Sequence, residues 1–236
     1  MAKVVLSKIS TPNTSPTMAS PPTTTAAQLL SISIALLASG GIASLSLFNV
    51  PLLQSQPASR SLPQTRWLFS RGSHTFPQAA FLSSAGFAYL AWTAVPSGSF
   101  GDLVGLVAKG ERVSGYVAAA VLTLSIAPVT ALGMIPTNFA LIQKNEDLGG
   151  ARSEKSAREG DARPGRRSAE ESVNAQGVVD ELTDLSGPQE RTTEESSEED
   201  DREVRELLGK FAALNGLRAV LMGLGGVVGL WTALTV

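Results

Sequence analysis

Residues 211–234 read FAALNGLRAVLMGLGGVVGLWTAL and contain one charged side chain, Arg218. An α-helix rises 1.5 Å per residue, so about 20 apolar residues cross the roughly 30 Å hydrocarbon core of a bilayer. Three other stretches are comparably apolar: residues 26–48, 76–95 and 116–135. The sequence therefore predicts an all-α protein, a bundle of four transmembrane helices in a lipid bilayer.

The parts between these helices differ sharply in composition. Residues 1–25 are rich in Ser, Thr and Pro and are predicted to form a disordered tail. Residues 150–206 hold nine of the 19 basic and 17 of the 21 acidic side chains and few apolar ones. We therefore expect a disordered charged insert at 149–203, which would divide the membrane domain into residues 26–148, with three helices, and 204–236, with the fourth.

Basic residues near the membrane predict the topology. Arg60, Arg66 and Arg71 fall in the loop expected between Pro51 and the second helix. Alternation places this loop and the charged insert on the same side of the membrane. The positive-inside bias then predicts that loops one and three are cytoplasmic and that both termini are lumenal, in an integral protein of the endomembranes.

The composition excludes several chemistries. The chain has no cysteine and one histidine, His74, which rules out thiolate sites, disulfides and multi-histidine metal sites. No phosphate-binding loop, nucleophile elbow or zincin motif is present. We expect no metal, no bound cofactor and no nucleic-acid partner.

Two features bear on helix packing. Pro128 lies inside the third apolar stretch and is expected to kink that helix. Gly225 and Gly229 have the GxxxG spacing that permits close approach of two helix backbones. The same glycines suit packing within one chain, so they do not predict a dimer.

A few polar residues at membrane depth are the candidate site, because such groups are costly there and tend to face the bundle interior. These polar residues lie at the start of the second helix, at the end of the third and early in the fourth. Because the helices alternate in direction, all three places fall at the same end of the bundle. The residues are His74, Gln78, Thr137, Asn138, Asn215 and Arg218. Asn215 and Arg218 share one helix face and could hold a phenolate or enolate oxygen. Alternatively, Arg218 reaches the lipid headgroups, Asn215 bonds a neighbouring helix and His74 is a surface residue.

Two short motifs stand out near the third apolar stretch: residues 127–130 read APVT, and residues 134–138 read MIPTN and are followed by Leu141. They resemble the third-helix signature of the anthrone oxygenase-like family of small four-helix membrane proteins. Phe211, Asn215 and Arg218 match its fourth-helix pattern, with phenylalanine where tryptophan is usual. The second-helix entry is similar in Arg66-Trp67, Gly72 and Pro77, but lacks a tyrosine often found before the glycine.

The resemblance implies a function. Fungal members act in secondary metabolism, where they oxidise a polyketide-derived anthrone to an anthraquinone with dioxygen as co-substrate. By this resemblance Arg218 and Asn215 would stabilise an enolate, and His74 or a bound water would take the proton. Asn138, Thr137 and Gln78 would bind the aromatic polyketide substrate.

A second hypothesis comes from another class of protein. The chain could be a non-catalytic membrane scaffold or accessory subunit of a biosynthetic complex. The charged insert would then be the arm that docks biosynthetic partner proteins.

Overall fold

The computed structural model describes residues 22–96, 99–109, 112–174 and 183–235, which are helical with no strand. The predicted disordered tail therefore lies outside the described residues except for 22–25, which belong to the first helix. That helix comprises α1 (Pro22–Ser44), the π-helical turn η1 (Leu45–Asn49) and α2 (Val50–Gln54). The second long helix is α3 (Ala58–Thr93), and the last is α10 (Glu198–Thr235).

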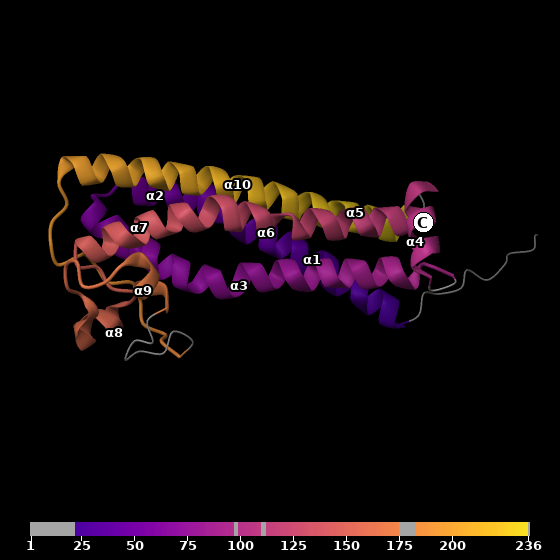
Figure 1. The fold of residues 1–236 in the computed structure, drawn as a ribbon, viewed down its shortest axis with the longest axis horizontal. Helices are drawn as coiled ribbons and strands as arrows, with labels where there is room; N and C mark the ends of the chain where they lie inside the picture. Colours follow the sequence, from indigo (N-terminus) through magenta and orange to yellow (C-terminus); the bar gives the residue numbers. More distant parts are fainter. Residues whose placement is uncertain (1–21, 97–98, 110–111, 175–182, 236) are drawn as a thin grey trace, which may run out of the picture.

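The third long helix is assembled from four segments. They are α5 (Arg112–Leu124), α6 (Ile126–Val129), the π-helical turn η2 (Thr130–Met134) and α7 (Ile135–Asp147). The short helix α4 (Phe100–Lys109) precedes it at the end where α3 finishes. Figure 1 shows the four long helices side by side, with α1 and α5 each packed between α3 and α10.

The all-helical architecture is confirmed, but the four predicted spans are supported only in part. Among the described residues, three helices are long and apolar enough to cross a membrane: Pro22–Gln54, Arg112–Asp147 and Glu198–Thr235. Helix α3 is not among them. Even its apolar second half contains polar residues such as Gln78, Ser83 and Ser84, which lower its mean hydropathy below that of the other three helices.

The first loop is much shorter than the sequence suggested. Pro51 does not end the first helix, which runs to Gln54, and α3 already begins at Ala58. Residues 55–57 alone connect the two helices, so Arg60, Arg66 and Arg71 lie on α3 rather than in a loop.

Both π-helical turns precede a proline. The N–H of Val50 bonds the carbonyl of Leu45, and that of Ile135 bonds the carbonyl of Thr130. Each is a bond to the fifth residue back, and the next residue is Pro51 or Pro136. A proline ring clashes with the carbonyl four residues earlier, so a wider turn at this point relieves the clash while the helix continues.

The glycines of α10 face three different helices of the same chain. A Cβ built on Gly225 would meet Thr123 of α5, one on Gly226 would meet Leu36 of α1, and one on Gly229 would meet Phe87 of α3. The GxxxG spacing thus serves packing inside the bundle. It positions α10 closely against each neighbour.

Gly229→Ala is expected to destabilise the bundle. The added Cβ would lie 2.3 Å from Cε1 of Phe87, whose side chain is fully buried. Overpacking of this kind costs about 1–3 kcal/mol. Gly216→Ala on the same helix is the matched control, since nothing lies within 4 Å of its Cβ position; there alanine should stabilise by about 0.5–1 kcal/mol. Thermal unfolding of both variants in detergent checks this, and equal midpoints would contradict it.

The charged insert is folded, which differs from the predicted disorder. Its described residues include α8 (Glu154–Ser156), the turn η3 (Ala157–Asp161) and α9 (Ala169–Asn174), and they lie against the ends of α3 and α7 (Figure 1). The Trp67 Nε1 donates to the carbonyl of Ser186 at 3.0 Å, and the N–H of Thr192 donates to that of Ser59 at 2.8 Å. Residues 175–182 lie outside the described part.

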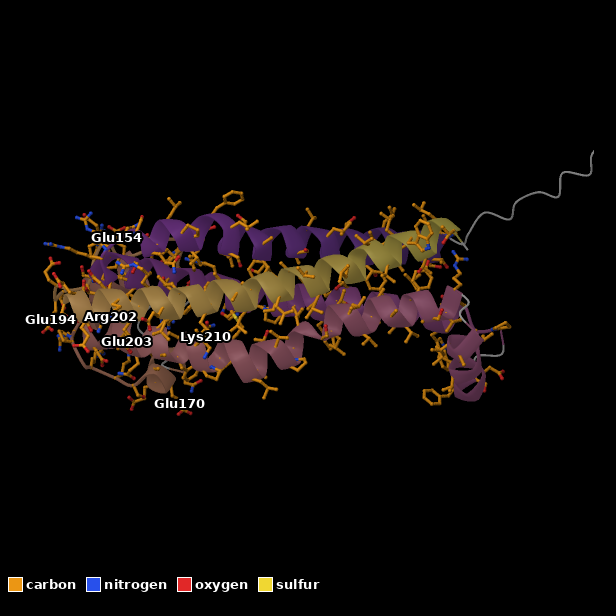
Figure 2. All side chains as sticks on the ribbon, turned by 90° about the horizontal axis from the view of Figure 1, so that it is seen from above. Glu154, Glu170, Glu194, Arg202, Glu203 and Lys210 are labelled. Carbon is orange, nitrogen blue, oxygen red and sulfur yellow. The ribbon has the colours of Figure 1, made fainter. Side chains whose placement is uncertain are left out.

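Charge pairing explains why so polar a segment packs. Glu146, 1 % exposed, accepts from Arg167 Nε at 3.2 Å and from Ser172 Oγ at 2.5 Å. Arg66 donates to the Ser172 carbonyl at 3.1 Å, and Asp161 pairs with Arg167. Figure 2 shows the labelled charged residues gathered at this end of the bundle. Low hydrophobicity predicts disorder only when the charges find no such partners.

The two ends of the insert meet. Helix α7 stops at Gly149, whose φ of +74° and lack of room for a Cβ require glycine there. The N–H of Glu194 donates to the Leu148 carbonyl at 3.0 Å, and that of Thr193 to the Gly149 carbonyl at 3.3 Å. The chain thus returns to the point where it left α7 before it enters α10.

Acid should loosen the insert. Burial raises the pKa of Asp161, but the Ser156 hydroxyl and the guanidinium groups of Arg167 and Arg166 outweigh burial and hold this pKa below its ordinary value of 3.8. A carboxyl with a lower pKa when folded stabilises the fold above its ordinary pKa, and this contribution is lost as the pH falls through the folded value. The protection of residues 151–174 against hydrogen exchange, relative to the intrinsic rate at each pH, should therefore fall on acidification below the ordinary value of 3.8. Asp161→Asn should reduce that response, and an identical pH profile in the variant would contradict the assignment.

Candidate functional site

The core of the bundle is divided into two apolar clusters, and a polar pair separates them along α10. One cluster contains Phe211 and Met134 at the insert end, and the other contains Met222 and Ile126 towards the opposite end. Asn215 and Arg218 lie between Phe211 and Met222 on the buried face of α10. Their side chains are only 1 % and 6 % exposed. Arg218 is therefore inside the bundle and does not extend to the surface.

Arg218 and Asn215 are hydrogen-bonded to each other, but each also has a donor without an acceptor. Arg218 Nη1 donates to Asn215 Oδ1 at 2.9 Å. Within the part of the chain that the structure describes, Arg218 Nε and Asn215 Nδ2 are buried and have no acceptor, and no carboxylate pairs with the guanidinium. A buried cation without an anion is costly. Such an arrangement is suited to an anionic ligand that completes the pairing.

Arg218 lines a pocket of about 220 Å³. The walls come from α3 and from the third long helix, and they are almost entirely apolar: Pro77, Ala80, Phe81, Leu124, Ile126, Ala127, Thr130, Ala131 and Ile135. The guanidinium is the charged group in this lining. An apolar cavity with one cationic group favours an apolar molecule that carries an anionic group.

The π-helical turn η2 shapes this pocket. Thr130 and Ala131, its first two residues, line the cavity, and the Thr130 hydroxyl donates to the Ile126 carbonyl at 2.8 Å. Gly133 lies against Leu214, directly before Asn215. π-helical turns are frequent at functional sites because they re-aim side chains within a helix.

Thr137 and Asn138 lie one turn beyond the pocket. Thr137 is buried, and its hydroxyl donates to the Gly133 carbonyl at 3.0 Å. Asn138 is half-buried, and its Oδ1 is enclosed with no hydrogen bond to any described residue. Neither residue lines the pocket.

His74 and Gln78 do not join the buried pair. Because α3 begins at Ala58, both lie within the helix rather than at its start. Their side chains are exposed, although Pro77 and Phe81 on the same side of α3 line the pocket. The predicted convergence of all six polar residues is therefore not observed in full. Of the six, Asn215 and Arg218 are hydrogen-bonded to each other.

Sequence reasoning missed the apolar lining. Phe81 and Ile126 carry no signal that distinguishes them from other residues of a membrane helix, whereas Thr130 stood in the motif at residues 127–130 without a predicted role in the pocket. The paired prolines Pro128 and Pro136 were the available indication, since they flank the irregular segment that forms one wall.

Comparison with known proteins identifies the family of the chain. The sequence model of the anthrone oxygenase family matches residues 65–228, which include the pocket, Asn215 and Arg218. The anthrone oxygenase encC of Aspergillus fumigatus is 33 % identical over 202 residues, which cover 83 % of this chain and 86 % of that protein. No solved structure gave a significant match. The resemblance found in the motifs is thus confirmed, and the chain belongs to the anthrone oxygenase family.

Proposed function

We propose that this chain is a membrane-bound oxygenase that converts a polyketide-derived anthrone to an anthraquinone with dioxygen and without a bound cofactor. One observation carries the proposal: a buried arginine with unpaired donors faces an apolar pocket. Membership of the anthrone oxygenase family supports the class of substrate.

The chemistry requires little from the protein. Loss of a proton from the central methylene of an anthrone gives an aromatic enolate. This electron-rich anion transfers one electron to dioxygen, and recombination at the same carbon forms a C–O bond to a peroxide. Elimination of water breaks the O–O bond and leaves the quinone carbonyl, so one anthrone and one dioxygen give one anthraquinone and one water.

Arg218 and Asn215 would hold the enolate oxygen. Arg218 Nε and Asn215 Nδ2 are donors without acceptors in the described structure, so they are free to bond a charge that develops on the substrate. Donors fixed in a water-poor site stabilise such an oxyanion without reorganisation. The anion would also neutralise the buried guanidinium.

The remaining polar residues have proposed roles around this pair. Asn138, with an unbonded Oδ1, would accept a hydrogen bond from a substrate phenol, beside Thr137. His74 would receive the proton at the outer side of α3, where Gln78 would bind the exposed edge of the substrate. Pockets for small molecules commonly measure about 300–1,000 Å³, so the 220 Å³ cavity must widen on binding. We expect the irregular segment α6–η2 to move.

The scaffold hypothesis receives no comparable support. It makes the charged insert an arm that docks partner proteins, and the described residues of the insert bond α3 and α7 of the same chain. We also propose that the insert faces the cytoplasm in an endomembrane. Protease treatment of sealed microsomes would cleave the insert from outside if this is so.

Quinone formation tests the proposal. Membranes that contain the chain are supplied with a polyhydroxylated anthrone under air and under nitrogen, and the absorbance of the quinone is followed. Membranes that lack the chain correct for spontaneous oxidation. We expect an oxygen-dependent excess that survives dialysis and metal chelation. Equal rates with correctly folded protein would refute the proposed reaction.

A further inference from the structure

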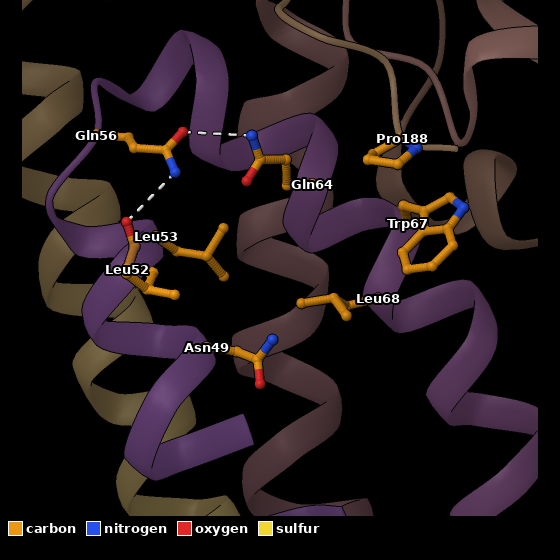
Figure 3. A pocket seen from close by; sticks show the side chains of 8 residues that line it. All are labelled: Asn49, Leu52, Leu53, Gln56, Gln64, Trp67, Leu68 and Pro188. Carbon is orange, nitrogen blue, oxygen red and sulfur yellow. Dashed lines mark hydrogen bonds between the residues drawn. The ribbon is translucent and has the colours of Figure 1, made fainter. Parts of the chain in front are cut away.

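A second pocket, of about 290 Å³, lies at the insert end of the bundle (Figure 3). It is enclosed by α2, α3, the end of η1 and the insert. Its lining combines aliphatic, amide and aromatic side chains: Asn49, Leu52, Leu53, Gln56, Gln64, Trp67, Leu68 and Pro188. None of these residues lines the Arg218 pocket.

The two pockets are separate along α3. The second is lined by Gln64, Trp67 and Leu68, and the first by Pro77, Ala80 and Phe81. About ten residues at 1.5 Å per residue put roughly 15 Å between these positions. A ligand in one pocket therefore leaves the other open.

The polar groups of the second pocket are neutral amides. Gln64 Nε2 donates to Gln56 Oε1 at 3.3 Å across the upper rim (Figure 3). Asn49, the last residue of the π-helical turn η1, points into the cavity, and its amide makes no hydrogen bond to any described residue. No lining side chain is charged. These groups suit hydroxyl and carbonyl groups of an uncharged ligand.

The Trp67 ring is held in place from outside the cavity. Its Nε1 donates to the Ser186 carbonyl at 3.0 Å, and the Arg71 guanidinium lies 5.3 Å from the ring centroid. Ring carbons therefore face the pocket, next to Pro188 of the insert. A rigid aromatic surface opposite leucines is suited to a flat polycyclic ring system.

We propose that this pocket is a second binding site for a flat polycyclic phenol in its uncharged form, which the chain holds at the membrane surface apart from the oxidation site. That the phenol is an anthrone-type compound rests on the proposed function. The shape and the neutrality of the site are independent of that function. The two pockets differ in the charge they accept. The Arg218 pocket favours an anion, and the Trp67 pocket favours the neutral molecule.

Fluorescence of Trp67 tests the site directly. Trp92→Phe and Trp231→Phe, at exposed positions, leave Trp67 as the single tryptophan of the full chain in lipid nanodiscs. Titration with a neutral hydroxyanthraquinone, which cannot be oxidised further in the reaction, should give saturable quenching. Asn49→Leu or Gln64→Leu should raise the dissociation constant about tenfold, as expected for the loss of one hydrogen bond of about 1–1.5 kcal/mol. Asn174→Leu, an exposed amide of the insert, is the matched control.

The outcomes separate this site from the proposed reaction. Saturable quenching that persists in Arg218→Met supports a site independent of catalysis, even if no quinone forms in the oxidation assay. Quenching that does not saturate, or that neither Asn49→Leu nor Gln64→Leu weakens, overturns the proposal. Displacement of the quinone by a fatty acid but not by a second polycyclic phenol would identify a lipid site and also overturn it.

Discussion

Arg218→Met should lower kcat for quinone formation by about 10²–10³-fold, the usual effect of removing one preorganised oxyanion donor. The fold should not suffer. The guanidinium is buried without a carboxylate in the described structure, and replacing an unpaired buried charge by an apolar side chain of similar length is neutral or stabilising. The variant should thus lose activity while its thermal midpoint stays equal or rises.

Two controls make this result specific. Lys210→Met removes an exposed cation from the same helix and should leave both kcat and the midpoint unchanged. Arg218→Lys keeps the charge but not the planar fork and should restore part of the activity. A lower midpoint together with lost activity in Arg218→Met would mean that the arginine is structural. Unchanged kcat would remove Arg218 from the site.

Glu146→Ala should release the insert from the bundle. The carboxylate is 1 % exposed and bonds Arg167 and Ser172 of the insert. Removal of one partner from a buried ion pair costs about 3–5 kcal/mol, because the other charge is left without compensation. We expect the opening free energy of residues 151–174, measured by hydrogen exchange, to fall by about this amount.

The matched control is Glu154→Ala. Glu154 pairs with Arg158 at the surface of the same insert, with 47 % of its side chain exposed, and exposed pairs contribute at most about 1 kcal/mol. Glu146→Gln, which keeps an acceptor for Ser172 without the charge, should lie between the two. Equal protection in all three variants would show that the insert is held by its other contacts.

The fold was predictable where apolar residues dominate. Long apolar runs can only be buried in lipid or in other helices, so 26–48, 116–135 and 211–234 all fall within observed helices. The first half of α3 was not predictable in this way. Ser59 and Arg66 are polar, and the bonds that bury them come from distant parts of the chain.

The candidate site was predictable only in part. Asn215 and Arg218 stand out because polar side chains inside a membrane helix need a reason, and they form the pair that the structure shows. His74 stood out by chemistry alone, and its exposure depends on which face of α3 packs inward. The pocket depends on the π-helical turn at Thr130–Met134, a change of one residue in helix register that no local pattern fixes beyond the proline that follows it.

The meeting of the two ends of the insert has a consequence for how proteins of this architecture can diverge. Because the chain leaves at Gly149 and returns at Thr193, where backbone hydrogen bonds join the two ends, the length of the segment between them does not set the distance between α7 and α10. Evolution can lengthen, trim or exchange this segment without moving α7 relative to α10. An engineer can use the same junction to graft a reporter domain, and the graft would replace the Pro188 wall while the helices around Arg218 keep their register.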